Sequence, residues 1–214
     1  LLKVINLFLF VFAYFNKSID KIVKAPHGNK YDNIIIFDDG TKINIQNKKF
    51  IHLENRGHSF DRRHISKTFN NQFIRKYLTL LTLIRPAKRL SHMTNNQKKD
   101  FISLCNNNLE DIKQYLKKTL IGVENKNDYW CIMKETKNSS AINLYIIKSD
   151  AFYSIIEKSI NIDIKFKNNG TCLHLCPYIS LQRKGAGNTD HSPNHIQSKL
   201  KITKELLDKC KQIL

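Results

Sequence analysis

The sequence predicts a fold of the α/β or α+β class, with a sheet flanked by helices and a helical insertion. Strand-like runs stand near both ends, helical spacing fills the middle, and no segment repeats. At 214 residues the chain is expected to form a single domain. Within it we separate residues 1–66, which hold a hairpin, residues 67–122, which are helical, and residues 123–214, which hold later strands.

The chain opens on a strongly apolar segment, "LLKVINLFLFVFAYF". Its uninterrupted part, residues 7–15, is too short to span a bilayer, and no small-residue cleavage site of a signal peptide follows. The sequence also starts without Met. We therefore expect a buried helix or strand that belongs to a longer gene product, and no membrane partner.

A β-hairpin is predicted next. "NIIIF" at 33–37 is a short apolar run, "DDGT" at 38–41 places Asp-Gly at a turn, and "KINIQNKKFIHL" at 42–53 alternates between apolar and polar residues. The basic stretch 56–64 that follows, "RGHSFDRRH", is expected to be a loop.

Three helices are predicted in the middle of the chain. Apolar spacing indicates an amphipathic helix from Lys67 to about Ile84, and Pro86 breaks it. Thr94 caps the second helix, Asn107 or Asn108 caps the third, and Gly122 closes the third.

The last third of the sequence returns to strands. Residues 129–136 and 142–148 are expected to be two strands, and a helix capped by Ser149 follows them. Residues 163–175 predict a strand and a turn. Residues 178–202, "YISLQRKGAGNTDHSPNHIQSKLKI", predict a strand, a polar loop and a second strand.

The charge balance predicts a polyanionic partner. The chain has 36 Lys and Arg against 18 Asp and Glu, a formal net charge of +18. A biased genome explains abundant Lys and Asn but not the shortage of acidic residues. Nucleic acid is the partner that this excess favours.

The five cysteines predict reduced thiols and a cytoplasmic location, because their number is odd and nothing else indicates secretion. Cys172, His174 and Cys176 also permit a zinc interpretation. Their C-x-H-x-C spacing differs from the usual knuckle, and no second pair stands nearby, so buried thiols are favoured.

The hairpin carries a set of residues with the spacing D-x13-Q-x-K. Asp32 begins the first strand, Gln46 and Lys48 share one face of the second, and the pairing of a hairpin brings them together. A carboxylate and an amide oxygen can hold Mg²⁺, which generates a hydroxide, while the lysine ammonium orients that water or stabilises the phosphorus transition state. A Lys- and Asn-rich strand also produces Q-x-K by chance. Asp38 and Asp39 are a rival carboxylate pair, although the Asp39-Gly40 turn favours exposure.

Several segments together resemble one nuclease family. "KYD", "INIQNKK", "ENRG", "FDRRH", "YWCIMKET", "ISLQRKGAGN" and "IQSKLKI" are similar, in order and interval, to type II restriction endonucleases of the HinP/MspI group. These enzymes cut short GC-only palindromes and belong to the PD-(D/E)xK superfamily. The resemblance runs from about Ile19 to Leu206. The long N-terminal helix of the group has no counterpart, which implies an N-terminally truncated member.

The resemblance implies a restriction-endonuclease-like core with a mixed central sheet flanked by helices. Residues 1–66 would hold the catalytic hairpin and residues 123–214 the DNA-recognition strands. Asp32 matches the metal-binding aspartate, Gln46 the amide that replaces the usual acidic ligand, and Lys48 the catalytic lysine. Mg²⁺ is the implied cofactor.

The resemblance also implies a DNA-binding set. Gln182, Arg183 and Lys184 match the base-reading strand, where Arg and Lys suit the acceptors of guanine. Phe60 is either a wedge between base steps or an ordinary core residue. The full set is Arg56, Phe60, Arg62, Arg63, Gln182, Arg183, Lys184, Asn188, Gln197 and Lys199.

The function predicted is cleavage of double-stranded DNA at a short GC-rich palindrome, with GCGC as the inferred site. A cytosine methyltransferase encoded nearby would protect the host without binding the enzyme, which is expected to be a monomer or weak dimer. Two alternatives remain open: a basic nucleic-acid-binding module without catalysis, and a ribosome- or tRNA-associated basic protein.

Overall fold

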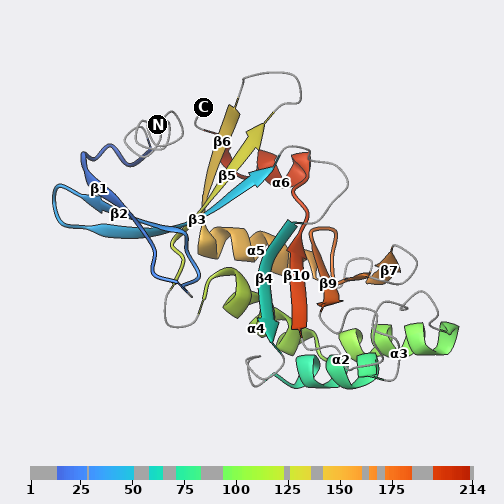
Figure 1. Ribbon diagram of the computed structural model, residues 1–214. Coiled ribbons are helices and arrows are strands. Elements are labelled where there is room, and N and C mark those ends of the chain that lie inside the picture. Colours follow the sequence, from blue (N-terminus) through green and yellow to red (C-terminus); the bar gives the residue numbers. More distant parts are fainter. Residues whose placement is uncertain are drawn as a thin grey trace. The chain divides into compact units, whose positions relative to one another are not determined.

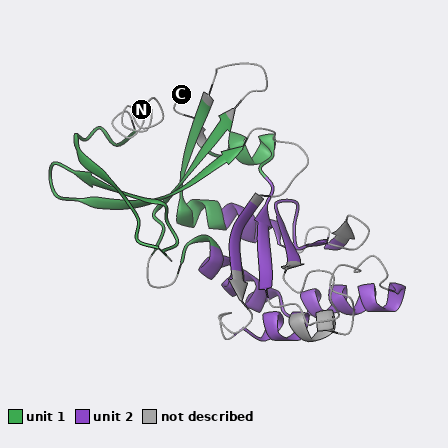
Figure 2. Ribbon diagram, viewed as in Figure 1, with its two compact units in different colours: residues 1–56, 120–153, 202–214 green, residues 57–119, 154–201 purple. Residues whose placement is uncertain are grey.

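A computed structural model describes most of the chain, namely residues 14–27, 29–50, 58–64, 71–82, 94–122, 126–135, 142–160, 164–167, 172–184 and 195–212. Sheets and helices both occur there, which confirms the mixed α/β class. The chain divides into two compact units, shown in Figure 2. Unit 1 comprises residues 1–56, 120–153 and 202–214, and unit 2 comprises residues 57–119 and 154–201.

Unit 1 is built on a six-stranded mixed sheet with the order β1-β2-β3-β5-β6-β11 (Figure 1). Its strands are β1 (Ile19–Lys24), β2 (Asn33–Phe37), β3 (Lys42–Phe50), β5 (Tyr129–Glu135), β6 (Ile142–Lys148) and β11 (Lys211–Gln212). β3 and β5 are parallel, and the other neighbouring pairs are antiparallel. Short α6 (Lys204–Asp208) precedes β11.

The predicted β2–β3 hairpin is confirmed, including its Asp-Gly turn. Gly40 has a φ of 77°, a left-handed conformation that glycine adopts without a steric penalty. The backbone N–H of Thr41 and its hydroxyl both donate to Asp39 Oδ1. Asp39 also pairs with Lys17 at 2.7 Å. These bonds hold the pKa of Asp39 well below its usual range, so this carboxylate stabilises the turn.

One face of the unit 1 sheet packs into a hydrophobic core. Its buried members are Ile35, Phe37, Ile45, Cys131, Leu144 and Ile146. Tyr14 and Phe15 pack against them, and the Phe15 ring lies 5.5 Å from that of Phe37. The last two residues of the apolar N-terminal segment are thus partly buried, while residues 1–13 lie outside the described chain.

Unit 2 is built on a five-stranded antiparallel sheet with the order β4-β10-β9-β8-β7. Its strands are β4 (His58–His64), β7 (Lys165–Lys167), β8 (Cys172–His174), β9 (Ile179–Lys184) and β10 (His195–Leu200). The helices of the unit are α2 (Gln72–Thr82), α3 (Asn95–Asn106) and α4 (Leu109–Leu120), which ends at the unit boundary, together with the second half of α5 (Ser149–Ser159), which the boundary divides.

Helix α4 fixes which face of this sheet is buried. The Tyr115 hydroxyl of α4 forms a 2.9 Å hydrogen bond with the Ser198 hydroxyl of β10. Ile196, Ser198 and Leu200 are buried, whereas Gln197 and Lys199, which alternate with them, are half-buried. The α4 side is therefore the core side, and the Gln197 side is the opposite face.

Helix capping is partly as predicted. Thr94 caps α3 in a capping box with Gln97, as predicted. Ser149, the predicted cap of α5 (Ser149–Ser159), is its first helical residue, and its hydroxyl accepts from Asn127 Nδ2. α2 begins at Gln72 rather than at Lys67, because the Asn71 side chain accepts the Ile74 N–H and donates to the Asp111 carbonyl.

Three strands correct the sequence-based outline. The stretch 56–64, expected to be a loop, contains β4, which pairs with β10 through a register shift. β1 was not predicted, because a bulge between Ile19 and Lys21 breaks its alternation. β11 is too short for a periodic signal. Among the described residues, no helix is long and apolar enough to cross a membrane.

Candidate active site and nucleic-acid interface

The β2–β3 register brings Asp32 and Gln46 into direct contact. Asn33 pairs with Ile45, so the preceding Asp32 meets the following Gln46. The Gln46 Nε2 donates to Asp32 Oδ2 at 2.5 Å, and the backbone N–H of Asn47 donates to the same oxygen at 2.8 Å. Asp32 itself donates its N–H to the Ile45 carbonyl at 2.9 Å. The carboxylate is therefore held at a fixed place beside β3.

Lys48 is the third member of this group. It stands two residues after Gln46 on β3, so both side chains leave the same face of the strand. Burial lowers the pKa of the Lys48 ammonium below its ordinary value of 10.5, and the negative charge of Asp32 opposes that shift. Lys48 is thus a partly desolvated cation within electrostatic reach of the carboxylate.

The site combines a buried amide with an exposed carboxylate. Gln46 is 4% exposed, and its backbone pairs with that of Trp130 on β5. Asp32 is exposed and lies before the first residue of β2. The exposed carboxylate of Asp32 can therefore meet a hydrated cation without a large rearrangement.

The residues present fit a Mg²⁺ ion that is bound by few protein ligands. Mg²⁺ prefers oxygen ligands, keeps several waters and is commonly bound through one or two carboxylates. Both described donors use Asp32 Oδ2, and a carboxylate has about four lone-pair sites, so capacity remains for a cation. Among the described residues, no group of three or more His, Cys, Asp or Glu could hold a metal, so substrate and water would have to complete the coordination.

Two neighbouring contacts that the sequence did not predict support the hairpin. Asn47 Nδ2 donates to Asn33 Oδ1 at 2.6 Å, across the β2–β3 pair. The Asn44 N–H donates to Asp128 Oδ2 at 2.7 Å, which ties β3 to the segment before β5. A hairpin register counted from the Asp-Gly turn could have revealed the contact of Asn47 with Asn33. Nothing in the sequence near Asn44 indicates its contact with Asp128.

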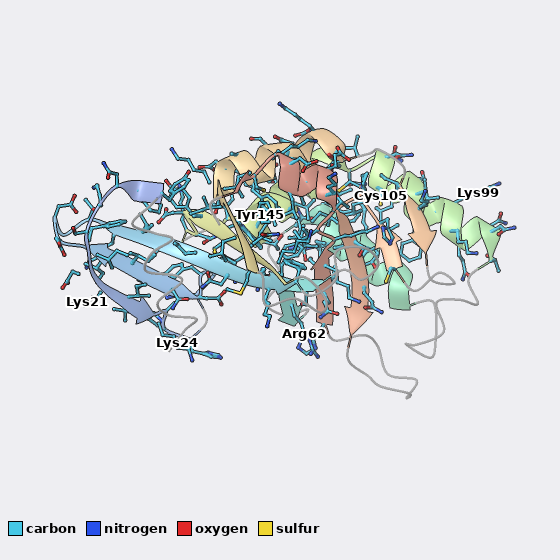
Figure 3. The ribbon with its side chains drawn as sticks, turned by 90° about the horizontal axis from the view of Figure 1, so that it is seen from above. Lys21, Lys24, Arg62, Lys99, Cys105 and Tyr145 are labelled. Atoms are coloured by element: carbon cyan, nitrogen blue, oxygen red, sulfur yellow. The ribbon has the colours of Figure 1, made fainter. Side chains whose placement is uncertain are left out.

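A second group of the predicted residues lies together on the unit 2 sheet. Gln197 of β10 stands directly opposite Gln182 of β9 on one side and Arg62 of β4 on the other. Lys199 lies two positions from Gln197 on the same face of β10. Arg62 extends outward from β4, as Figure 3 shows. The structure therefore aligns cationic and amide side chains across three strands.

The remaining predicted DNA-binding residues are placed less completely. Arg63 and Arg183 each stand opposite Ile196, and Lys184 stands opposite His195, while their side chains lie outside what the structure describes. Arg56 and Asn188 are also outside the described residues. Phe60 is 7% exposed, which favours the core alternative over a wedge between base steps.

The cysteines show the features of buried, unreactive thiols. All five are buried, and none of them forms a disulfide. Burial raises the pKa of Cys176 to about 11. Cys172 and His174 share β8, but Cys176 follows the end of that strand, so the three do not lie on one strand. The interpretation as core thiols is therefore favoured over a zinc site.

Comparison with known proteins identifies the fold. No family model and no curated protein matches the sequence. A crystal structure of the restriction endonuclease MspI in complex with its cognate DNA is similar, with a TM-score of 0.53 and 13% sequence identity. The match covers 92% of this chain and 77% of that one. The chain therefore has a restriction-endonuclease-like fold, with a mixed central sheet flanked by helices.

Proposed function

We propose that the chain is a Mg²⁺-dependent endonuclease that hydrolyses phosphodiester bonds in double-stranded DNA at a short GC-rich palindrome, with GCGC as the first candidate. The single observation that carries this proposal is the contact of Asp32 with Gln46, next to Lys48, on one hairpin. The restriction-endonuclease-like fold and the net charge of +18 support it.

In this mechanism, Asp32 and the Gln46 oxygen would hold the metal. When bound, Mg²⁺ would supply an activated water and offset the charge of the phosphate. The amide of Gln46 and the N–H of Asn47 fix the Asp32 carboxylate, so its free lone pairs keep one orientation. Lys48, as a cation in a partly desolvated position, stabilises the charge that develops on the phosphate oxygens.

DNA would be bound by the cationic residues outside this hairpin. Arg62 and Lys199 offer charge that suits phosphates or guanine edges, and Gln182 and Gln197 offer amides that suit base edges. We further propose a nearby cytosine methyltransferase gene and an enzyme that acts as a monomer or weak dimer. A nucleic-acid-binding module without catalysis is the alternative that the experiment must distinguish from a nuclease.

Nicking of supercoiled plasmid DNA in Mg²⁺ tests the proposal. The wild-type chain should nick plasmids that contain GCGC, and Lys48→Ala should slow nicking by about 100-fold or more while duplex binding persists. Lys99→Ala, on an outward-extending side chain of α3 (Figure 3), is the matched control and should nick at the wild-type rate. DNA binding by the wild type with no nicking of any duplex would favour the binding module instead.

A further inference from the structure

The side chains of Asn33 and Asn47 are bonded to each other across the end of the β2–β3 pair. Asn33 is the first residue of β2 and pairs with Ile45, so Asn47 lies diagonally opposite it on the same face of the sheet. The Asn47 Nδ2 donates to Asn33 Oδ1 at 2.6 Å, and both residues are half-buried. The bond is therefore partly shielded from competing water.

Asn47 is bonded to Asp32 as well as to Asn33. Its backbone N–H donates to Asp32 Oδ2 at 2.8 Å. The paired residues of β2 and β3 end at Asn33 and Ile45, so the Asp32 carboxylate takes an N–H of β3 that lies beyond the paired residues. One residue of β3 thus holds two consecutive residues of the opposite chain segment, one through its side chain and one through its backbone.

Asp32 stands where the chain enters the sheet, which is a place that needs a restraint. It is exposed and precedes the first residue of β2, and the ends of strands open more easily than their centres. The bond to Asn47 keeps Asn33 on β3. The neighbouring Asp32 carboxylate then stays within reach of its two described donors, the Gln46 amide and the Asn47 N–H.

We propose that Asn33 and Asn47 are positioning residues for the proposed metal site: their bond fixes the orientation of the Asp32 carboxylate, and so sets how tightly the chain binds Mg²⁺. This inference rests on the proposed function. Neither asparagine side chain has to touch the cation. Replacing a residue that orients a metal ligand typically changes metal affinity by about 10- to 100-fold, and a ligand that is ordered only on binding costs conformational entropy.

Thermal unfolding of the full chain in a series of MgCl₂ concentrations, at constant ionic strength, measures cation binding without requiring cleavage. A ligand of the native state raises the melting temperature, and the concentration dependence of that rise gives the dissociation constant. Asn33→Ala and Asn47→Ala each remove one side of the bond, while the backbone N–H at position 47 remains. Asp32→Asn, which lacks the charge of the proposed ligand, gives the background response to MgCl₂.

Each alanine variant should require about tenfold more Mg²⁺, or more, for the same stabilisation as the wild type. The double variant should require no more than the weaker-binding single variant, because either substitution alone removes the whole bond.

Thr41→Ala is the matched control, because it weakens the same hairpin at its other end. It removes the hydroxyl that donates to Asp39 Oδ1, at the Asp-Gly turn. This variant should melt at a lower temperature than the wild type and keep the wild-type dependence on Mg²⁺. Loss of hairpin stability is thereby distinguished from loss of metal affinity.

Two results would overturn the inference. Alanine variants that melt at a lower temperature but keep the wild-type Mg²⁺ dependence would make the Asn33–Asn47 bond a stabilising contact only, and would leave the proposed nuclease intact. A wild type that responds to MgCl₂ no more than Asp32→Asn would refute the metal site of the proposed function, and the inference with it. Because the two substitutions lie on different strands, a single variant that folds poorly leaves the other to decide.

Discussion

The carboxylate of Asp128 accepts a 2.7 Å hydrogen bond from the backbone N–H of Asn44, two residues before Gln46 in β3. The backbones of the two residues are also joined, because the Asp128 N–H donates to the Asn44 carbonyl at 2.9 Å. The side chain of Asn44 adds a 3.0 Å bond to the Lys126 carbonyl. This cluster anchors the strand that carries Gln46 and Lys48 to the segment that leads into β5.

Replacing Asp128 by Ala should lower the free energy of unfolding by about 1.5–3 kcal/mol, since a hydrogen bond to a charged acceptor is lost. Urea denaturation followed by circular dichroism measures the change. Asp100→Ala, at an exposed position of α3, is the control and should stay within about 0.5 kcal/mol of the wild type. Equal effects of the two substitutions would show that the Asn44 contact contributes no stability.

Asp32→Asn should abolish the response to Mg²⁺ while the fold persists. The asparagine side chain keeps an oxygen that can accept from Gln46 and Asn47, but it lacks the charge that holds a divalent cation. Thermal unfolding with and without millimolar MgCl₂ measures the response of each protein to the cation. Mg²⁺ should raise the melting temperature of the wild type, as expected for a ligand of the native state, and not that of the variant. An undiminished Mg²⁺ shift in the variant would remove Asp32 from the proposed metal site.

The pH dependence of nicking should carry the signature of Lys48. Its cation is the form proposed to act, and burial lowers its pKa below 10.5, so nicking should decline as pH rises through a value lower than that of an exposed lysine. Lys48→Arg keeps the positive charge at every accessible pH and should lose this alkaline decline. Single-turnover rates across the alkaline range provide the measurement. An identical decline in both proteins would assign it to another group.

The five cysteines should resist modification in the native protein. Thiolates are the reactive form, and burial raises the pKa of Cys105 and Cys131 to about 12. A chromogenic disulfide reagent at pH 8 should label the native chain slowly and all five thiols after denaturation. Rapid labelling of any thiol without denaturant would show that it is accessible or that its region opens easily.

The β2–β3 hairpin could be predicted because its register follows from local chemistry. The Asp39-Gly40 turn fixes where β2 reverses, and from that point Ile36 pairs with Lys42 and Asn33 with Ile45. The approach of Asp32 to Gln46 then follows from counting residues. The roles of Asp32, Gln46 and Lys48 in metal binding and catalysis stay predictions, since contact alone does not establish chemistry.

Other features depended on partners that are distant in the sequence. β4 reads as a basic loop, and only its pairing with β10 makes it a strand. The alignment of Gln182 with Gln197 was not predictable, because the polar segment between their strands contains no turn motif that fixes a register. The parallel pairing of β3 with β5 joins segments between which β4, α2, α3 and α4 stand in the chain, and no local pattern specifies it.

The interleaving of the two units constrains how a nascent chain can acquire its structure. Unit 1 gathers three separated stretches, and its last strand lies within residues 202–214. On the ribosome, the β2–β3 hairpin emerges before β5, so the edge of β3 that pairs with β5 stays unpaired until β5 is translated. Non-local pairings of this kind slow folding and prolong the exposure of strand edges. Synthesis at a reduced temperature, or together with a chaperone, should therefore increase the yield of folded chain.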